Sequence, residues 1–92
     1  MKYAKRTDGN HAIIRDGLRQ LGFVVFDSST FGCGCPDLMV AGGGRVVFLE
    51  IKEGNAKLTQ AEREFFRMFD GLGVYVVRTL EQAIEILRRE SI

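Results

Sequence analysis

The hydrophobic residues of this chain follow two spacings, and each spacing predicts a different kind of element. Apolar side chains three and four residues apart predict a helix over residues 9–21, with Gly22 as its C-terminal stop. The inward-facing residues of this helix are expected to be Ile13, Ile14, Leu18 and Leu21. A short apolar run at residues 23–26 predicts the first strand.

Two further apolar runs, separated by three glycines, predict a β-hairpin between Asp37 and Lys52. Consecutive glycines supply the positive φ angles of a two-residue turn, so Gly43 and Gly44 are the expected central residues. Counting outward along the antiparallel ladder then places Asp37 opposite Glu50. A turn that differs by one residue would change this register.

The rest of the chain predicts a helix, a strand and a closing helix. Thr59 is the expected N-cap of the first of these helices, which ends near Gly71. Its apolar residues are Phe65, Phe66, Met68 and Phe69. Residues 75–77 form the expected strand, and Thr79 caps the closing helix. The inward residues of that helix are Ala83, Ile84 and Leu87. The order αβββαβα predicts one α/β domain over residues 1–92, with a mixed central sheet flanked by helices.

Three ionisable residues interrupt the apolar hairpin and are the candidates for catalysis. Asp37 and Glu50 would share one face with Cβ atoms roughly 5 Å apart, and Lys52, two residues beyond Glu50, points to the same side. The flanking apolar residues predict that the second hairpin strand is buried on both faces. Like charges opposite each other destabilise a sheet, so a bound ligand is expected to offset this cost.

A hard divalent cation held by carboxylate oxygens meets that need, and Mg²⁺ fits best, with Mn²⁺ as a substitute. The backbone carbonyl of Ile51 is a further candidate ligand, and water would fill the remaining positions. Lys52 is then expected to orient the attacking water or to stabilise charge on a phosphate. The simpler alternative is a solvated Glu50–Lys52 pair at a strand end, with Asp37 merely starting a strand after Pro36.

These residues carry a family resemblance. The pair Pro36-Asp37, followed beyond a glycine turn by Glu50-Ile51-Lys52, resembles the PD-(D/E)xK nuclease superfamily. From about Thr7 to Leu87 the chain is similar to the small VRR-NUC domain, which occurs alone in phages and fused to DNA-repair proteins. The segments that support the resemblance are residues 8–11, 32–38, 49–52, 57–59 and 74–78. The resemblance implies a restriction-endonuclease-like fold, magnesium-dependent endonuclease activity and homodimers that act on branched DNA such as four-way (Holliday) junctions.

The resemblance also adds accessory candidates. An acidic residue on the first helix often helps to hold the metal in this superfamily, and Asp8 matches that position, although it fits equally well as a helix N-cap. Asn10 is a further candidate, and His11 is either a proton-transfer residue or, more commonly for such a position, a surface histidine. The family usually has a glutamine where this chain has Glu62. Thr59 and Glu62 also fit a capping box, so both interpretations of Glu62 stay open.

The net charge of the chain is only +1, so the local placement of basic residues matters more than their total. Lys57, Arg63 and Arg67 lie near the candidate site in sequence and are candidate contacts to DNA phosphates. Arg63 and Arg67 are four residues apart and share one helix face, and the alternative is a solvated face paired with Glu64. Residues 1–6 are expected to form a flexible basic arm.

The loop before the hairpin holds Cys33 and Cys35, which lack the further ligands that a zinc site requires, so reduced thiols are expected. Phe31, in the same loop, is expected to cover the core, with a DNA contact as the alternative. No apolar run is long enough to span a membrane, which predicts a cytoplasmic protein, in the host cytoplasm if phage-encoded. Two other function classes remain, namely a catalytically silent DNA-binding module and a small α/β interaction subunit.

Overall fold

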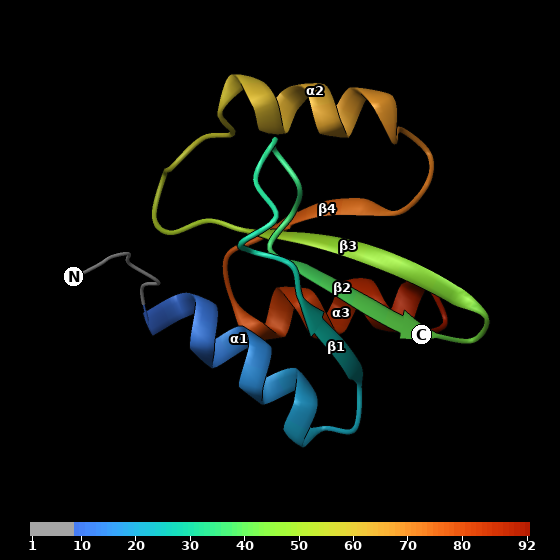
Figure 1. The fold of residues 1–92 in the computed structure, drawn as a ribbon. Helices are drawn as coiled ribbons and strands as arrows, with labels where there is room; N and C mark the ends of the chain where they lie inside the picture. The colour runs from blue at the N-terminus through green and yellow to red at the C-terminus, as the bar shows by residue number, and fades with distance from the viewer. Residues whose placement is uncertain (1–8) are drawn as a thin grey trace.

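The computed structural model describes residues 9–92, which form the predicted order αβββαβα around one four-stranded mixed sheet (Figure 1). The helices are α1 (Gly9–Gln20), α2 (Gln60–Met68) and α3 (Leu80–Arg89). The strands are β1 (Val24–Asp27), β2 (Leu38–Gly42), β3 (Arg45–Ile51) and β4 (Val74–Val77). They lie in the order β1-β2-β3-β4, and β4 runs parallel to β3 while the other neighbours are antiparallel. Asp8 and the expected basic arm lie outside the described residues.

The hairpin between β2 and β3 has the predicted turn and register. Gly43 and Gly44 both have positive φ angles, 57° and 76°, which a two-residue turn of this kind requires. The pairing runs from the turn to Leu38, which lies opposite Leu49. One further step along the same ladder brings Asp37 opposite Glu50, as predicted.

The sheet has a fully packed face and a half-covered face. Helices α1 and α3 lie on the same side of the sheet, as Figure 1 shows, and the main core is on this side. The fully buried apolar residues of this core are Ile14, Leu18, Leu38, Val40, Val47, Leu49, Val77, Ala83 and Leu87. Helix α2 lies on the opposite side, where Phe65 and Phe69 pack against Phe48 of β3 with ring centroids 5.6 and 5.8 Å away. None of its residues is fully buried.

Several predicted core positions are exposed instead. Ile13 and Leu21 of α1 are 62% and 58% exposed, because the buried stripe of this helix runs through His11, Ile14 and Leu18. The prediction that they face inward is therefore wrong. Phe31 does not cover the core but is 58% exposed, with its ring 5.7 Å from that of Phe26.

The prediction that β3 is buried on both faces holds only for the second half of the strand. Val46, near its start, is 43% exposed, because α2 does not extend over this end of the sheet. At the other end of the chain, Ile86 of α3 belongs to the core although the sequence did not single it out. None of the described helices has the length and apolar character needed to cross a membrane.

Candidate functional site

The candidate site forms where the start of β2, the end of β3 and the start of α2 meet. Asp37 lies just before β2, and its Oδ2 accepts a hydrogen bond of 2.8 Å from the backbone N–H of Ile51. This bond ties the Asp37 side chain to the end of β3, beside Glu50. Glu50 is only 3% exposed, so two carboxylates meet in a nearly dry environment. The predicted pairing of the two acidic residues is thus present.

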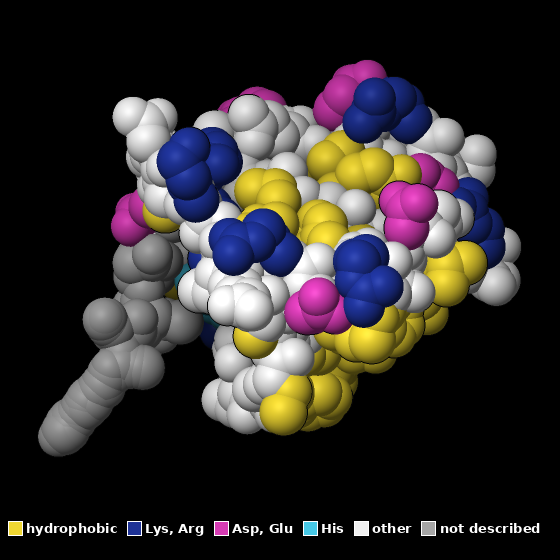
Figure 2. All heavy atoms as spheres, turned by 90° about the horizontal axis from the view of Figure 1, so that it is seen from above, with side chains coloured by type: hydrophobic (Ala, Val, Ile, Leu, Met, Phe, Trp, Pro, Cys, Tyr) yellow, Lys and Arg dark blue, Asp and Glu magenta, His cyan; other side chains and the backbone are white. Residues whose placement is uncertain are grey.

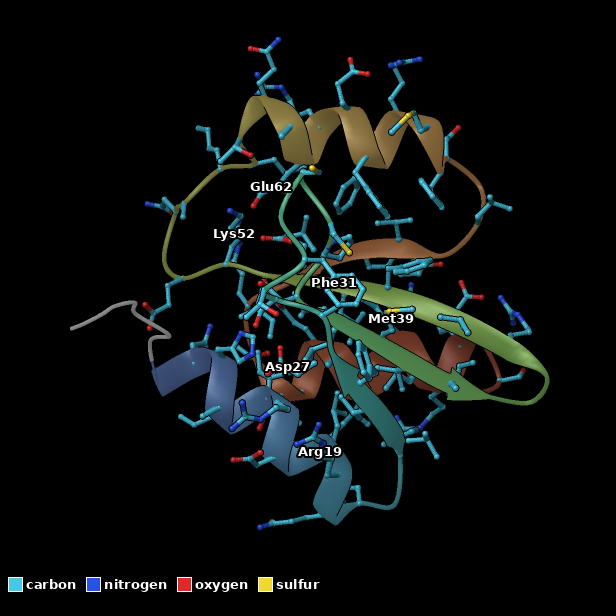
Figure 3. All side chains as sticks on the ribbon, viewed as in Figure 1. Arg19, Asp27, Phe31, Met39, Lys52 and Glu62 are labelled. Atoms are coloured by element: carbon cyan, nitrogen blue, oxygen red, sulfur yellow. The ribbon has the colours of Figure 1, made fainter. Side chains whose placement is uncertain are left out.

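Lys52 extends from the end of β3 toward α2, and Figure 3 shows its side chain pointing to that of Glu62. Its Nζ lies 2.8 Å from Oε1 of Glu62 and 3.5 Å from Oε2 of Glu50. The side chains of Lys52 and Glu50 are only 14% and 4% exposed. The alternative of a solvated ion pair at a strand end is therefore wrong.

Glu62 forms the predicted capping box and also contacts Lys52. Its Oε1 accepts a hydrogen bond of 2.8 Å from the Thr59 N–H, and its own N–H donates to the Thr59 hydroxyl at 3.2 Å, which completes the predicted capping box. The same carboxylate is the closest partner of Lys52. Burial by itself would raise the pKa of Glu62, but the hydrogen bonds from Lys52 and Thr59 lower it.

The pKa values of the two central carboxyl groups are raised. For Glu50, burial is the main cause, the negative charges of Asp37 and Glu62 add to it, and the pKa rises to about 9. Burial also raises the pKa of Asp37, in spite of the hydrogen bond from Ile51. Without a cation, Glu50 therefore keeps a proton at neutral pH.

One atom of the site has no partner. Oε1 of Glu50 is buried and has no hydrogen-bond partner among the described residues, which costs free energy in a folded protein. A divalent cation between Asp37 and Glu50 would be bound by this oxygen and would favour the ionised form of both groups. The residues present therefore fit a magnesium ion.

The rest of the coordination shell is not made of side chains. Within residues 9–92 no three histidine, cysteine, aspartate or glutamate side chains form a ready metal-binding group. Backbone and water oxygens would have to complete the shell, as is common for Mg²⁺. The Ile51 backbone is held at the site through its bond to Asp37, so its carbonyl remains a candidate ligand.

Asn10 lies behind the site and supports it from α1. Its Nδ2 donates hydrogen bonds to the backbone carbonyls of Lys52 at 3.2 Å and Arg78 at 3.1 Å. These bonds fasten the start of α1 to the segments that follow β3 and β4. Asn10 thus holds the Lys52 backbone and does not reach the site with its amide nitrogen.

His11 is buried, with 4% exposure, and its Nε2 lies 3.0 Å from Oδ2 of Asp27. The prediction of a surface histidine is wrong, because the first turn of α1 packs against the end of β1. Asp27 is a residue that the sequence did not single out. It also accepts bonds from Arg15 at 3.0 Å and from the N–H and hydroxyl of Ser29 at 3.0 and 2.6 Å. The Asp-Ser-Ser run, which favours a side-chain-capped turn, was the available signal.

The loop after β1 brings Asp37 to the site. Ser28 is fully buried, and its N–H donates to the Asp37 carbonyl at 2.8 Å while its hydroxyl donates to the Pro36 carbonyl at 2.7 Å. Gly34, with a φ of 80°, lies so close to α2 that an added Cβ would be 2.2 Å from the Ala61 carbonyl oxygen. The loop is thus packed tightly between β1 and the start of α2. Its two cysteines are free thiols.

The candidate DNA-binding residues lie apart from the carboxylates. Arg63 and Arg67 line a groove of about 700 Å³ between α2 and β4, whose lining includes Arg45 and Tyr75 but none of Asp37, Glu50 and Lys52. Lys57 is exposed in the segment before α2. In Figure 2, the α2 side of the molecule has hydrophobic side chains between those of lysine and arginine residues.

Each of the two arginines of α2 has a partner within the protein. The Arg63 Nη1 donates to the Leu58 carbonyl at 2.9 Å, and the Arg67 Nη2 lies 2.6 Å from Oε1 of Glu64. The pairing with Glu64 is the alternative that the helical spacing predicted. Arg67 and Glu64 remain largely exposed, with 70% and 55% side-chain exposure, so phosphate could replace this partner.

Comparisons with protein-family models, curated proteins and solved structures found no match. By its own structure the chain is an α/β domain with a buried cluster of two carboxyl groups and a lysine at the end of a central strand.

Proposed function

We propose that this protein is a magnesium-dependent endonuclease of the VRR-NUC type that hydrolyses DNA phosphodiester bonds. The observation that carries the proposal is the Glu50 side chain, which is only 4% exposed beside Asp37 and Lys52 and has a carboxyl oxygen without a partner. A carboxyl group in this position costs stability, and a bound cation removes that cost. The alternative of a small interaction subunit depended on a solvated Glu50–Lys52 pair, and the burial of both side chains argues against it.

Asp37 and Glu50 would hold the Mg²⁺ ion, with the Ile51 carbonyl and water as further ligands, and Mn²⁺ would substitute. The ion supplies positive charge that polarises the phosphate and lowers the pKa of a bound water. Asp37 is fixed for this role by the Ile51 N–H, and Glu50 by its place within β3.

Lys52 acts as a cation and not as a general base. Burial opposes its charge, but hydrogen bonds and attraction from Glu62 and Glu50 raise its pKa above the ordinary value. It therefore stays protonated at neutral pH and donates to the attacking water or to a phosphate oxygen. Glu62 is the positioning residue that holds the Lys52 ammonium group at the site.

The substrate and the assembly follow from the resemblance. We propose branched DNA, such as the four-way junction, as the substrate, and a homodimer as the active form. Two strands of a junction must be cut in a coordinated way, which a twofold-symmetric dimer with one site per strand achieves. The place of action would be the cytoplasm, in the host cell if the protein is phage-encoded.

Cleavage of defined DNA substrates tests this proposal. Purified protein is incubated with linear, single-stranded, flap and four-way DNA, in Mg²⁺ and in EDTA. The proposal expects cleavage only with the metal and best on the branched substrates. A protein that binds these DNAs but cleaves none of them in Mg²⁺ or Mn²⁺ would instead be the silent binding module.

A further inference from the structure

One face of the sheet exposes an apolar surface that no element of residues 9–92 covers. Helix α2 packs on Phe48 and leaves the β1–β2 half of its own side open, as Figure 1 shows. The apolar side chains of this half belong to β1, β2, the start of β3 and the loop after β1. We refer to them as the apolar face, which comprises the exposed Val24, Phe26, Phe31 and Val46 and the half-buried Met39 and Ala41.

The strand register shows that the apolar face is continuous. Phe26 lies opposite Met39, which in turn lies opposite Phe48 under α2. These three residues form one row across the strands. In a second row, Val24 lies opposite Ala41, which pairs with Val46. Phe31 packs on Phe26 from the loop. In Figure 2 hydrophobic side chains gather along the lower edge of the view, which is the side that faces the reader in Figure 1.

We propose that the apolar face is where a second copy of this chain binds, sheet face to sheet face across a twofold axis. The two rows carry no charged side chain, so two copies can bury them against each other without removing a charge from water. The same feature argues against DNA as the occupant, because binding of its phosphates depends on lysine and arginine.

The exposed area suits the core of a dimer interface. Val24, Phe26, Phe31 and Val46 are 68%, 54%, 58% and 43% exposed. With about 150 Å² for a fully exposed valine and about 200 Å² for a phenylalanine, they expose on the order of 400 Å². A stable dimer buries roughly 800 Å² per partner, in which an apolar centre is surrounded by a polar rim. The apolar face would supply about half of that area.

The neighbouring edge of the sheet disfavours a different mode of association. Strand β1 is an edge strand, and strand addition to it would need its outward backbone groups. The Arg19 side chain, shown in Figure 3, donates to the Val25 carbonyl at 3.1 Å and so occupies one of these groups. The contact of Arg19 therefore makes the β1 edge less suited to self-association than the apolar face beside it.

The apolar face is adjacent to the candidate site. Met39 is two residues beyond Asp37 on β2, and Phe48 is two residues before Glu50 on β3, so all four point to the same side of the sheet. Two residues along a strand correspond to roughly 7 Å. A second copy on the apolar face would therefore hold the two sites at a fixed separation. The inference rests on the homodimer proposed above and assigns its interface, but it does not depend on the nuclease activity.

Sedimentation velocity of the free protein, in EDTA and without DNA, tests the inference over a range of concentrations. We expect wild-type protein to approach twice its monomer mass of 10.3 kDa as concentration rises. Phe26→Lys should raise the dimer dissociation constant at least tenfold. Ile13→Lys, which changes a residue of similar exposure on α1, is the matched control and should leave the constant unchanged.

The inference is overturned if the wild-type protein remains a monomer at several hundred micromolar, or if Phe26→Lys associates as the wild type does. An equal effect of Ile13→Lys would also contradict it. Circular dichroism checks that each variant is folded. Should Phe26→Lys unfold, Val24→Lys at the 68% exposed start of β1 replaces it, with the same expected loss of dimer. A wild-type monomer would also contradict the homodimer proposed above, whereas a dimer that Phe26→Lys does not weaken would contradict only the assignment of this face. Neither result measures cleavage, so the nuclease activity is tested separately.

Discussion

The Lys52 ammonium group and the Thr59 backbone N–H share one acceptor, Oε1 of Glu62, at 2.8 Å each. A single carboxylate therefore helps to cap the N-terminus of α2 and also binds the lysine of the candidate site. A substitution in the first turn of α2 should therefore alter the position of the Lys52 ammonium group. A substitution of Lys52 should alter the N-terminal cap of α2.

Replacement of Glu62 should affect stability and cleavage together, because one carboxylate has both roles. Glu62→Ala removes the capping box and the Lys52 partner, so we expect a loss of about 1 kcal/mol in stability together with slower cleavage. Glu62→Gln keeps an acceptor for both groups and restores the residue that the resemblance implies, so it should retain most of the stability and activity. Denaturant midpoints and single-turnover rates measure both effects. Glu64→Ala, on the exposed side of the same helix, is the control and should change neither.

Lys52→Ala should retain Mg²⁺ binding but lose cleavage by about two to three orders of magnitude, because the ammonium group serves the water or phosphate and is not a metal ligand. Calorimetric titration with Mg²⁺ and single-turnover cleavage provide the two readouts. Lys57→Ala removes a nearby exposed lysine and should keep the wild-type rate of the chemical step. Near-normal cleavage by Lys52→Ala would exclude this residue from the mechanism.

The stability of the metal-free protein should fall as pH rises through the neutral range. The pKa of Glu50 is about 9 in the folded protein and close to 4.5 when unfolded, so the folded state binds more protons between these values. Raising the pH then favours unfolding. Denaturant midpoints at pH 5, 7 and 9 in EDTA should show a larger decline for the wild type than for Glu50→Gln, which cannot ionise. Equal slopes would mean that Glu50 ionises normally in the fold.

Arg67 should contribute to DNA affinity through a phosphate contact. Arg67→Ala should weaken binding to all DNA sequences alike and reduce the slope of log K against log salt by about 1. Arg88 is a matched control, because it is 71% exposed and pairs with Glu85 three residues away, as Arg67 does with Glu64. If Arg88→Ala has the same effect as Arg67→Ala, the groove beside α2 is not a specific DNA contact.

The parts of the fold that depend on local chemistry were predictable from the sequence. Consecutive glycines determined the hairpin turn, and the turn determined the register that places Asp37 opposite Glu50. The caps at Thr59 and Thr79 depend on residues three positions away and were also predicted. Such signals are contained in a few consecutive residues, so no knowledge of the tertiary structure is needed.

The errors concern contacts between distant segments. His11 is buried because Asp27, sixteen residues later, lies beside it, and nothing near His11 in the sequence signals this. Ile13 and Leu21 are exposed because the packing of α1 on β1 and α3 selects a neighbouring stripe of the helix. The sequence left the place of Glu62 open, because its contact with Lys52 depends on α2 beginning beside the end of β3.

The most direct test of the central claim is the cleavage of a labelled four-way junction by Asp37→Asn in Mg²⁺, with unfolding in EDTA as its companion. The asparagine oxygen can still accept the Ile51 N–H, while the cost of burying the charge of Asp37 beside Glu50 is removed. We predict no detectable cleavage and a stability equal to or slightly above that of the wild type. An Asp37→Asn protein that is destabilised by roughly 1 kcal/mol and still cleaves at the wild-type rate would contradict the assignment of this site.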